Sequence, residues 1–177
     1  MRKLFLFIAS ASLLTFAGCG NGETGGNANT GVPKGMVAAD LSEFGMQVLV
    51  NVPDSTTGPL EITANAQGGA DIKVGKAFQI SITEGEGNIE LKKQDITSDE
   101  VRKLVKYVVE EPTSILWEWQ MNEGGEPEFY FYSIVKTGNK SFEVFNVPGE
   151  VFSEKAASQM LDAAKSIRVK GEVKGDA

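Results

Sequence analysis

Residues 128–147 read EFYFYSIVKTGNKSFEVFNV, and they decide the fold because they predict a β-hairpin with one register. Apolar and polar side chains alternate in both halves, as is typical of strands. Residues 138–139, Gly-Asn, suit the two-residue turn that joins such strands. With that turn, apolar side chains meet across one face of the pair. The predicted pairs are Val135 with Phe142 and Ser133 with Val144.

Five earlier segments are predicted to be strands, most of them from the same alternation of side chains. In the first of them Phe44, Met46, Val48 and Val50 share one side. In the third, Gly75 indicates a β-bulge. The five segments are residues 43–53, 60–66, 70–83, 89–92 and 114–122.

Residues 96–112, ITSDEVRKLVKYVVEEP, have apolar side chains at helical spacing instead. Thr97 and Glu100 fit a capping box at the start, with Ile96 and Val101 placed as a hydrophobic staple. Pro112 follows the expected end. We therefore expect a helix here, with Val101, Leu104, Val105 and Val108 on its apolar side.

A second helix is expected after Ser153, whose hydroxyl suits an N-cap, with Glu154 at the positive end. Its apolar stripe comprises Ala157, Met160, Leu161 and Ala164. The predicted order is strands, helix, three strands, helix. Short connections favour a mainly antiparallel sheet of about six strands layered with two helices, an α+β domain over residues 38–170.

The start of the chain fits a secretory signal peptide over residues 1–18, with Arg2 and Lys3 before an apolar stretch from Leu4 to Ala17. That stretch is short for a membrane-spanning helix. The following FAGC resembles a bacterial lipobox, although Phe16 stands where an aliphatic residue is more usual. The resemblance implies that Cys19, the only cysteine, carries a diacylglyceryl group and becomes an acylated amino terminus. The alternative is an ordinary cleaved signal followed by a chance cysteine.

Residues 19–37 are rich in Gly, Asn and Thr and predict a flexible tether. In the bacterial lipoproteins that this segment resembles, an Asp at the position of Gly20 is the inner-membrane retention signal in some Gram-negative bacteria. The resemblance therefore implies a location in the cell envelope, with the outer membrane favoured over the inner. Residues 171–177 are expected to be a polar tail.

The net charge of the chain limits the classes of molecule that it is expected to bind. Loss of the signal lowers the basic residues from 17 to 15 against 24 acidic ones, which changes the net charge from −7 to about −9. Such a chain lacks the excess of basic residues that nucleic-acid-binding proteins use to contact phosphates. An anionic membrane surface would repel it, so the membrane is reached through the lipid on Cys19. No second cysteine is left for a disulfide, so the domain depends on its apolar core.

The order of these segments, ending in YFYSIVKTGNKSFEVFNVPGEVFSEKAASQMLDAAKSIRV (130–169), resembles the PsbP-like superfamily. The shared features are an early strand ending in VP, aromatic strands, and a closing helix with Met and small residues before SIR. The resemblance implies an antiparallel sheet layered with helices and a non-enzymatic role as an accessory subunit, assembly factor or binding protein. It transfers no site residues.

No catalytic motif stands out, and the sequence contains no histidine, the usual general base and metal ligand. We therefore expect no enzyme activity, no cofactor and no metal site. Lys136-Thr137-Gly138 matches a β-lactamase motif but reads as a turn. Two sets of side chains leave alternatives open. Paired carboxylates for a hydrolase could come from Glu118, Glu123, Glu126 and Glu128. Oxygen ligands for Ca²⁺ could come from Glu84, Glu86, Asn88 and Glu90.

The aromatic strands are the remaining candidates for a site. We expect Trp117, Trp119, Phe129 and Phe131 to form core beneath the helices. The opposite face would then present a surface for an envelope protein partner, because tyrosine offers large contact area at low entropic cost. The candidate face comprises Glu118, Gln120, Tyr130, Tyr132 and Phe145, with Glu143 beside them. The predicted function is a lipid-anchored accessory or binding protein; the alternatives are a carboxylate-dependent hydrolase and a small-ligand carrier.

Overall fold

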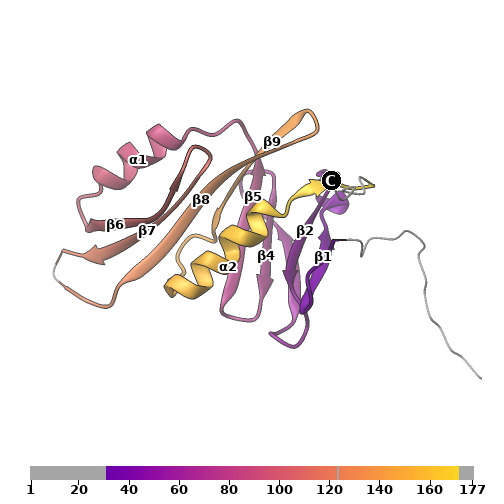
Figure 1. Cartoon of the computed structure of the whole chain (residues 1–177), viewed down its shortest axis with the longest axis horizontal. Helices are drawn as coiled ribbons and strands as arrows, with labels where there is room; N and C mark the ends of the chain where they lie inside the picture. Colours follow the sequence, from indigo (N-terminus) through magenta and orange to yellow (C-terminus); the bar gives the residue numbers. More distant parts are fainter. Residues whose placement is uncertain (1–30, 123, 172–177) are drawn as a thin grey trace, which may run out of the picture.

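The computed structural model describes residues 31–122 and 124–171, which form two antiparallel sheets and two α-helices (Figure 1). The predicted α+β class is confirmed, with ten strands rather than about six. The larger sheet has the order β3 (Leu60–Ala64), β4 (Ala70–Val74), β5 (Phe78–Glu84), β9 (Lys140–Asn146), β8 (Glu128–Thr137), β7 (Ser114–Met121), β6 (Arg102–Glu111). The smaller sheet has the order β1 (Met36–Asp40), β2 (Val48–Pro53), β10 (Arg168–Val169).

The hairpin predicted from residues 128–147 is confirmed as β8 and β9. Val135 lies opposite Phe142, and Ser133 lies opposite Val144. Gly138 has a φ of 60°, the left-handed conformation that a primed two-residue turn requires. The Lys136-Thr137-Gly138 motif is therefore part of this turn.

The helix predicted over residues 96–112 is wrong, because Arg102–Glu111 is strand β6. Two β-bulges explain the misleading pattern: Val105 and Val108 are extra residues that face no partner in β7. Each bulge adds one residue to the repeat, so the side chains opposite Trp119, Trp117 and Ile115 recur every third position instead of every second. They are Leu104, Tyr107 and Glu110.

Helix α1 (Ile89–Thr97) lies before this strand, where a short strand was predicted. The side chain of Asn88 caps it by accepting a hydrogen bond from the Leu91 N–H at 3.0 Å. Only Ile89 and Ile96 are buried, so its apolar periodicity is weak. Thr97 is its last residue rather than an N-cap.

Three boundaries near the start of the domain also differ from prediction. Residues 70–83 form the hairpin β4–β5 rather than one bulged strand, with Gly75 in its turn at a φ of 58°. Phe44 lies in the 3-10 helix η1 (Ser42–Phe44), so the next strand begins only at Val48. Strand β1 begins at Met36, two residues before the predicted domain and inside the predicted tether.

The second predicted helix is confirmed as α2 (Glu154–Lys165), and the hydroxyl of Ser153 accepts from the Ala156 N–H. Its predicted apolar stripe is buried in the larger core, which α2 shares with β2 and one face of the seven-stranded sheet. Figure 1 shows α2 crossing that sheet, whereas α1 lies beside β6 and β7. A smaller core beneath α1 contains Ile89 and Ile96 with both tryptophans.

The unequal cover of the two faces positions the candidate site. Helix α1 has nine residues, so it is roughly 14 Å long at about 1.5 Å per residue. Strand β8 beneath it has ten residues and spans roughly 33 Å at about 3.3 Å per residue. Part of this sheet face therefore extends beyond the helix.

Candidate functional site

Strand register divides the aromatic side chains differently from the prediction. Trp117 lies opposite Tyr130, and Leu116 lies opposite Phe131. Because directly opposed residues share a face, Trp117 and Trp119 lie with the tyrosines beneath α1. The predicted common core of Trp117, Trp119, Phe129 and Phe131 is therefore wrong. Alternation within each strand was read correctly, but the pairing of β7 with β8 could not be read from either strand alone.

The five predicted partner-binding residues are correspondingly split between two faces. Tyr130, Tyr132 and Phe145 lie together on the α1 face. Glu118 and Gln120 lie on the α2 face, where Glu118 pairs with Lys106 at 3.3 Å. The candidate site is therefore the part of the α1 face that the helix leaves uncovered.

Three aromatic rings form its floor. The Trp117 and Trp119 centroids are 5.4 Å apart and nearly perpendicular, at 82°. Tyr130 stacks on Trp117 at 6.0 Å and meets Trp119 edge-on at 5.3 Å. Trp117 and Trp119 are only 3% and 7% exposed. Edge-to-face and offset-stacked contacts are favourable aromatic geometries, so this floor is a packed platform.

Arg102 closes one end of the floor. Its guanidinium lies 3.9 Å from the Trp119 ring centroid and 5.7 Å from that of Tyr130, within cation–π range. Asp99 accepts hydrogen bonds from the Arg102 side chain at 3.0 and 3.3 Å and from its backbone N–H at 2.7 Å. Arg102 is thus held in place by a carboxylate and a ring.

Two tyrosine hydroxyls on this face donate to carboxylates. Tyr130 donates to Glu128 at 2.9 Å, and Tyr132 donates to Glu143. Burial, reinforced by the bond to Glu128, raises the pKa of Tyr130 to about 12. Burial and then the Glu143 bond raise the pKa of Tyr132 further. Both phenols are therefore neutral donors at physiological pH.

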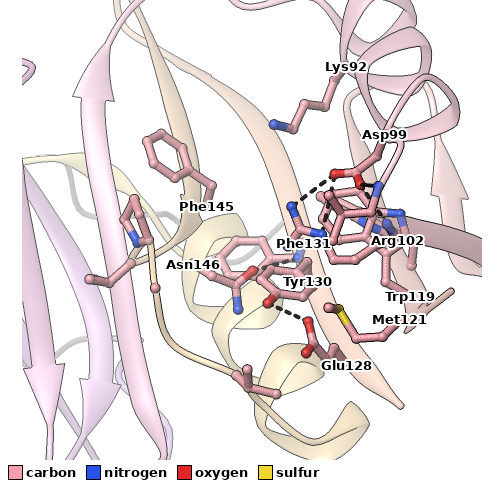
Figure 2. Close-up of a pocket in the computed structure, with 16 residues that line it drawn as sticks. Lys92, Asp99, Arg102, Trp119, Met121, Glu128, Tyr130, Phe131, Phe145 and Asn146 are labelled. Atoms are coloured by element: carbon pink, nitrogen blue, oxygen red, sulfur yellow. Dashed lines mark hydrogen bonds and ion pairs between the residues drawn. The ribbon is translucent and has the colours of Figure 1, made fainter. Parts of the chain in front are cut away.

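Two hollows open on this face and share Lys92 and Phe145 in their walls, and the three-ring floor belongs to the larger one. The larger has a volume of about 640 Å³ and lies between β6–β8 and the loop 146–151. The smaller, of about 610 Å³, lies beside α1 and is lined by Asn88, Tyr132 and Glu143 among others. We refer to the two hollows together as the groove; Figure 2 shows its larger part.

The rim of the groove is apolar and accessible. Within the described residues, seven large hydrophobic side chains are exposed, and four of these line the groove. Val101 and Val151 are 60% and 59% exposed, Leu91 58% and Met121 40%. They come from four separate segments of the chain. Apolar side chains that gather at one rim typically mark a binding surface.

Lys92 lies at the junction of the two hollows. Figure 2 shows its side chain reaching from α1 toward the space between Phe145 and the Asp99–Arg102 pair. Its ammonium lies 5.6 Å from the Tyr132 ring centroid. Among the described residues, no carboxylate lies within ion-pair distance of this ammonium, whereas neighbouring Lys93 pairs with both Glu90 and Glu110. Lys92 is therefore a half-buried cation whose charge is not neutralised by contact.

Three buried donors beside the groove lack a hydrogen-bond acceptor within the described part of the chain: the indole N–H groups of Trp117 and Trp119 and the side-chain amide of Asn146. The oxygen of that amide is used, since it accepts from the Phe131 N–H at 2.7 Å.

The carboxylates considered for hydrolysis are not brought together. Glu118 and Glu128 lie on opposite faces of the sheet, because Glu118 is opposite Phe129 and Glu128 is opposite Trp119. Each already has a partner, Lys106 and the Tyr130 hydroxyl. Glu126 is exposed, and Glu123 lies outside the described residues.

Three of the four residues considered for Ca²⁺ are used in local structure, and Glu86 is exposed. Glu84 pairs with Lys140 at 2.6 Å, Asn88 caps α1, and Glu90 pairs with Lys93. Residues 31–122 and 124–171 contain no cluster of three or more metal-ligating side chains.

Asp99, Val101 and Arg102 were not predicted as site residues, because the segment that contains them was predicted to be a helix. The available signal was the abundance of β-branched and aromatic residues in 101–109, VRKLVKYVV, which favours a strand. Lys92 and Val151 carried no comparable signal, since only the folded chain places α1 and the loop 146–151 around the same floor.

Cys19, the predicted signal peptide and most of the predicted tether lie outside the described residues. In the part of the chain that the structure describes, neither helix has the length and apolar character needed to cross a bilayer. Comparisons with protein-family models, with curated proteins and with solved structures give no match to this chain.

Proposed function

We propose that this chain is a lipid-anchored extracytoplasmic accessory protein of the PsbP-like kind that binds a partner through the groove. The sequence supports the address, because Cys19 follows an apolar signal-like stretch and precedes a Gly- and Asn-rich segment. Two or three acyl chains on Cys19 would anchor the domain firmly, whereas one short chain binds a bilayer only marginally.

One observation carries the binding role: four of the seven exposed large hydrophobic side chains in the described residues gather at the groove. Exposed apolar groups that surround a hollow over a packed aromatic floor resemble a binding site more than an ordinary solvated surface. The rigid floor favours affinity, because few buried side chains would lose further freedom on association.

Site-specific photocrosslinking in the native cells tests the binding role. A photoreactive residue replaces Val151 at the rim or, as a matched control, Leu60, which is 41% exposed and does not line the groove. We expect one reproducible adduct from position 151 and none from position 60. Val101→Asp should abolish that adduct, and an adduct that survives this charge at the rim would contradict the proposal.

Mass spectrometry and fractionation test the address. The mature chain should begin at Cys19 and carry the added mass of acyl chains, and Cys19→Ser should release the protein into the soluble fraction. A mature chain that begins elsewhere, or that has the mass of its amino acids alone, contradicts the anchor and leaves the groove proposal standing.

A small-ligand carrier is the second candidate, favoured by the volume of the larger hollow, about 640 Å³, which falls in the range of small-molecule sites. Native mass spectrometry of protein purified from its own cells distinguishes the two. A retained small molecule that is lost in Val151→Asp would favour the carrier.

A further inference from the structure

The accessible part of the groove differs from its floor. Trp117 and Trp119 are almost completely buried, and the guanidinium of Arg102 lies 3.9 Å from the Trp119 ring centroid. A sugar or planar ligand that stacks on an aromatic ring needs a free ring face. The side chains that solvent reaches are instead those of Leu91, Val101, Met121 and Val151. Such a surface suits the branched apolar side chains of a protein.

The charge at the centre of the groove selects among protein segments. Lys92 is half-buried, borders both hollows and has no carboxylate in ion-pair contact among the described residues. Arg102, the other cation in the larger hollow, is already held by Asp99. A carboxylate arriving with the partner would therefore meet Lys92, and charge-assisted hydrogen bonds of this kind are stronger than neutral ones.

We propose that the groove receives a segment of a partner protein in which a large apolar side chain is flanked by an Asp or Glu. The apolar side chain fills the larger hollow between Val101, Met121 and Val151, and the carboxylate binds the Lys92 ammonium. The inference rests on the proposed binding function and adds the chemistry of the partner. Because the whole chain has a net charge of −7, and Asp95 and Glu143 line the smaller hollow with Lys92, a preference for carboxylates would have to come from direct contact with the Lys92 ammonium.

Selection from a random peptide library displayed on phage tests this chemistry, with the full-length protein in detergent as target. Peptides that bind the wild type should contain an apolar side chain next to Asp or Glu. Selection on Lys92→Glu should replace these acids with Lys or Arg. Lys103→Glu makes the same charge change on the opposite sheet face, at an exposed lysine opposite Gln120, and should leave the selected motif unchanged.

Affinities of the selected peptides can be measured by intrinsic fluorescence, because both tryptophans of the chain lie in the groove. We expect Lys92→Glu to weaken binding at least tenfold, which corresponds to about 1.4 kcal/mol, and Lys103→Glu to change it less than twofold. Val151→Asp should abolish the fluorescence change.

The outcomes separate the two proposals. If Val151→Asp abolishes binding but Lys92→Glu alters neither affinity nor motif, the groove binds a partner and the carboxylate assignment is wrong. If neither variant matters, the binding function assigned to the groove fails as well. If vesicles of anionic phospholipid shift the tryptophan emission as the peptides do, the groove contacts a lipid surface and the protein partner is overturned.

Discussion

At the scale of single residues, Asn65 and Gly69 lock the β3–β4 turn onto β5. The Asn65 side-chain oxygen accepts from the Gly69 N–H at 2.7 Å, and the Asn65 side-chain NH₂ donates to the Ser81 hydroxyl and the Ile82 carbonyl at 3.0 and 3.2 Å. A Cβ at Gly69 would lie only 1.9 Å from the Ile82 carbonyl oxygen. Glycine is required here by the close approach of another backbone rather than by a positive φ.

Gly69→Ala should therefore destabilise the domain by about 3 kcal/mol or more, since the clash is with backbone that cannot rotate away. Gly68→Ala is the control, because a Cβ there meets nothing within 4 Å and only its φ of 81° is unfavourable; it should cost about 1–2 kcal/mol. Urea denaturation of both variants measures whether Gly69→Ala loses more stability than Gly68→Ala. Equal losses would show that the close approach at Gly69 is not the constraint.

The tyrosines make a second prediction at this scale. All three have raised pKa values in the folded chain: burial raises those of Tyr107 and Tyr132, and that of Tyr130 is about 12. The unfolded chain ionises near pH 10. Stability from these phenols is therefore complete below about pH 10 and is lost as the pH rises through the folded-state pKa values.

Spectrophotometric titration should place the phenolate ionisation of the native protein at higher pH than the normal step that appears near pH 10 in denaturant. Glu128→Gln should lower the pKa of Tyr130 part of the way, because burial is the larger cause and remains. A native titration that overlays the denatured one would refute the burial of these hydroxyls.

At the scale of elements, the hairpin β8–β9 and helix α2 could be predicted because local signals and packing agree in them. The turn at Gly138 sets the hairpin register, and the Ser153 cap precedes a broad apolar stripe. In the segment 89–111, by contrast, the local sequence signals and the packing disagree. The bulges at Val105 and Val108 imitate a helical repeat, while the real helix α1 buries only two side chains.

The same disagreement limited prediction of the site. Tyr130, Tyr132 and Phe145 were identifiable from alternation within their strands. Glu118 and Gln120 were assigned to the wrong face because the β7–β8 connection, which includes Gly124 and Gly125, does not fix register as a two-residue turn does. Lys92 and Arg102 could not be placed until α1 and β6 were placed.

Because α1 has a weak apolar face, its cap should matter. Asn88→Ala removes the acceptor for the Leu91 N–H and should lower the free energy of unfolding by about 1 kcal/mol. Gln94→Ala, at an exposed position of the same helix, should change it by less than about 0.5 kcal/mol. Chemical denaturation compares them, and an unchanged Asn88→Ala protein would mean that the cap contributes nothing to α1.

At the scale of the whole molecule, the seven-stranded sheet separates two cores of unequal size. The larger contains α2 and one face of β2, and the smaller contains α1 and both tryptophans. Tryptophan emission in the native state therefore reports on the smaller core alone.

Ile96→Ala and Met160→Ala remove fully buried side chains from the smaller and larger cores, respectively. Each should lower the free energy of unfolding by about 2–5 kcal/mol. Only Ile96→Ala should change the native tryptophan emission, because its cavity lies beside the indoles. An equal spectral change in Met160→Ala would show that the sheet does not separate the two cores.

The irregular outer strand β6 has a consequence for the protein's behaviour at high concentration. A straight unpaired strand can recruit copies of itself and start polymerisation into cross-β fibres. Strand β6, at one edge of the seven-stranded sheet, is made unsuitable for such pairing by its two bulges and by the charges of Lys103 and Lys106. Strand β3, at the other edge, has only five residues. The bulges that imitate a helical repeat thus also oppose pairing of this outer strand with a neighbouring copy.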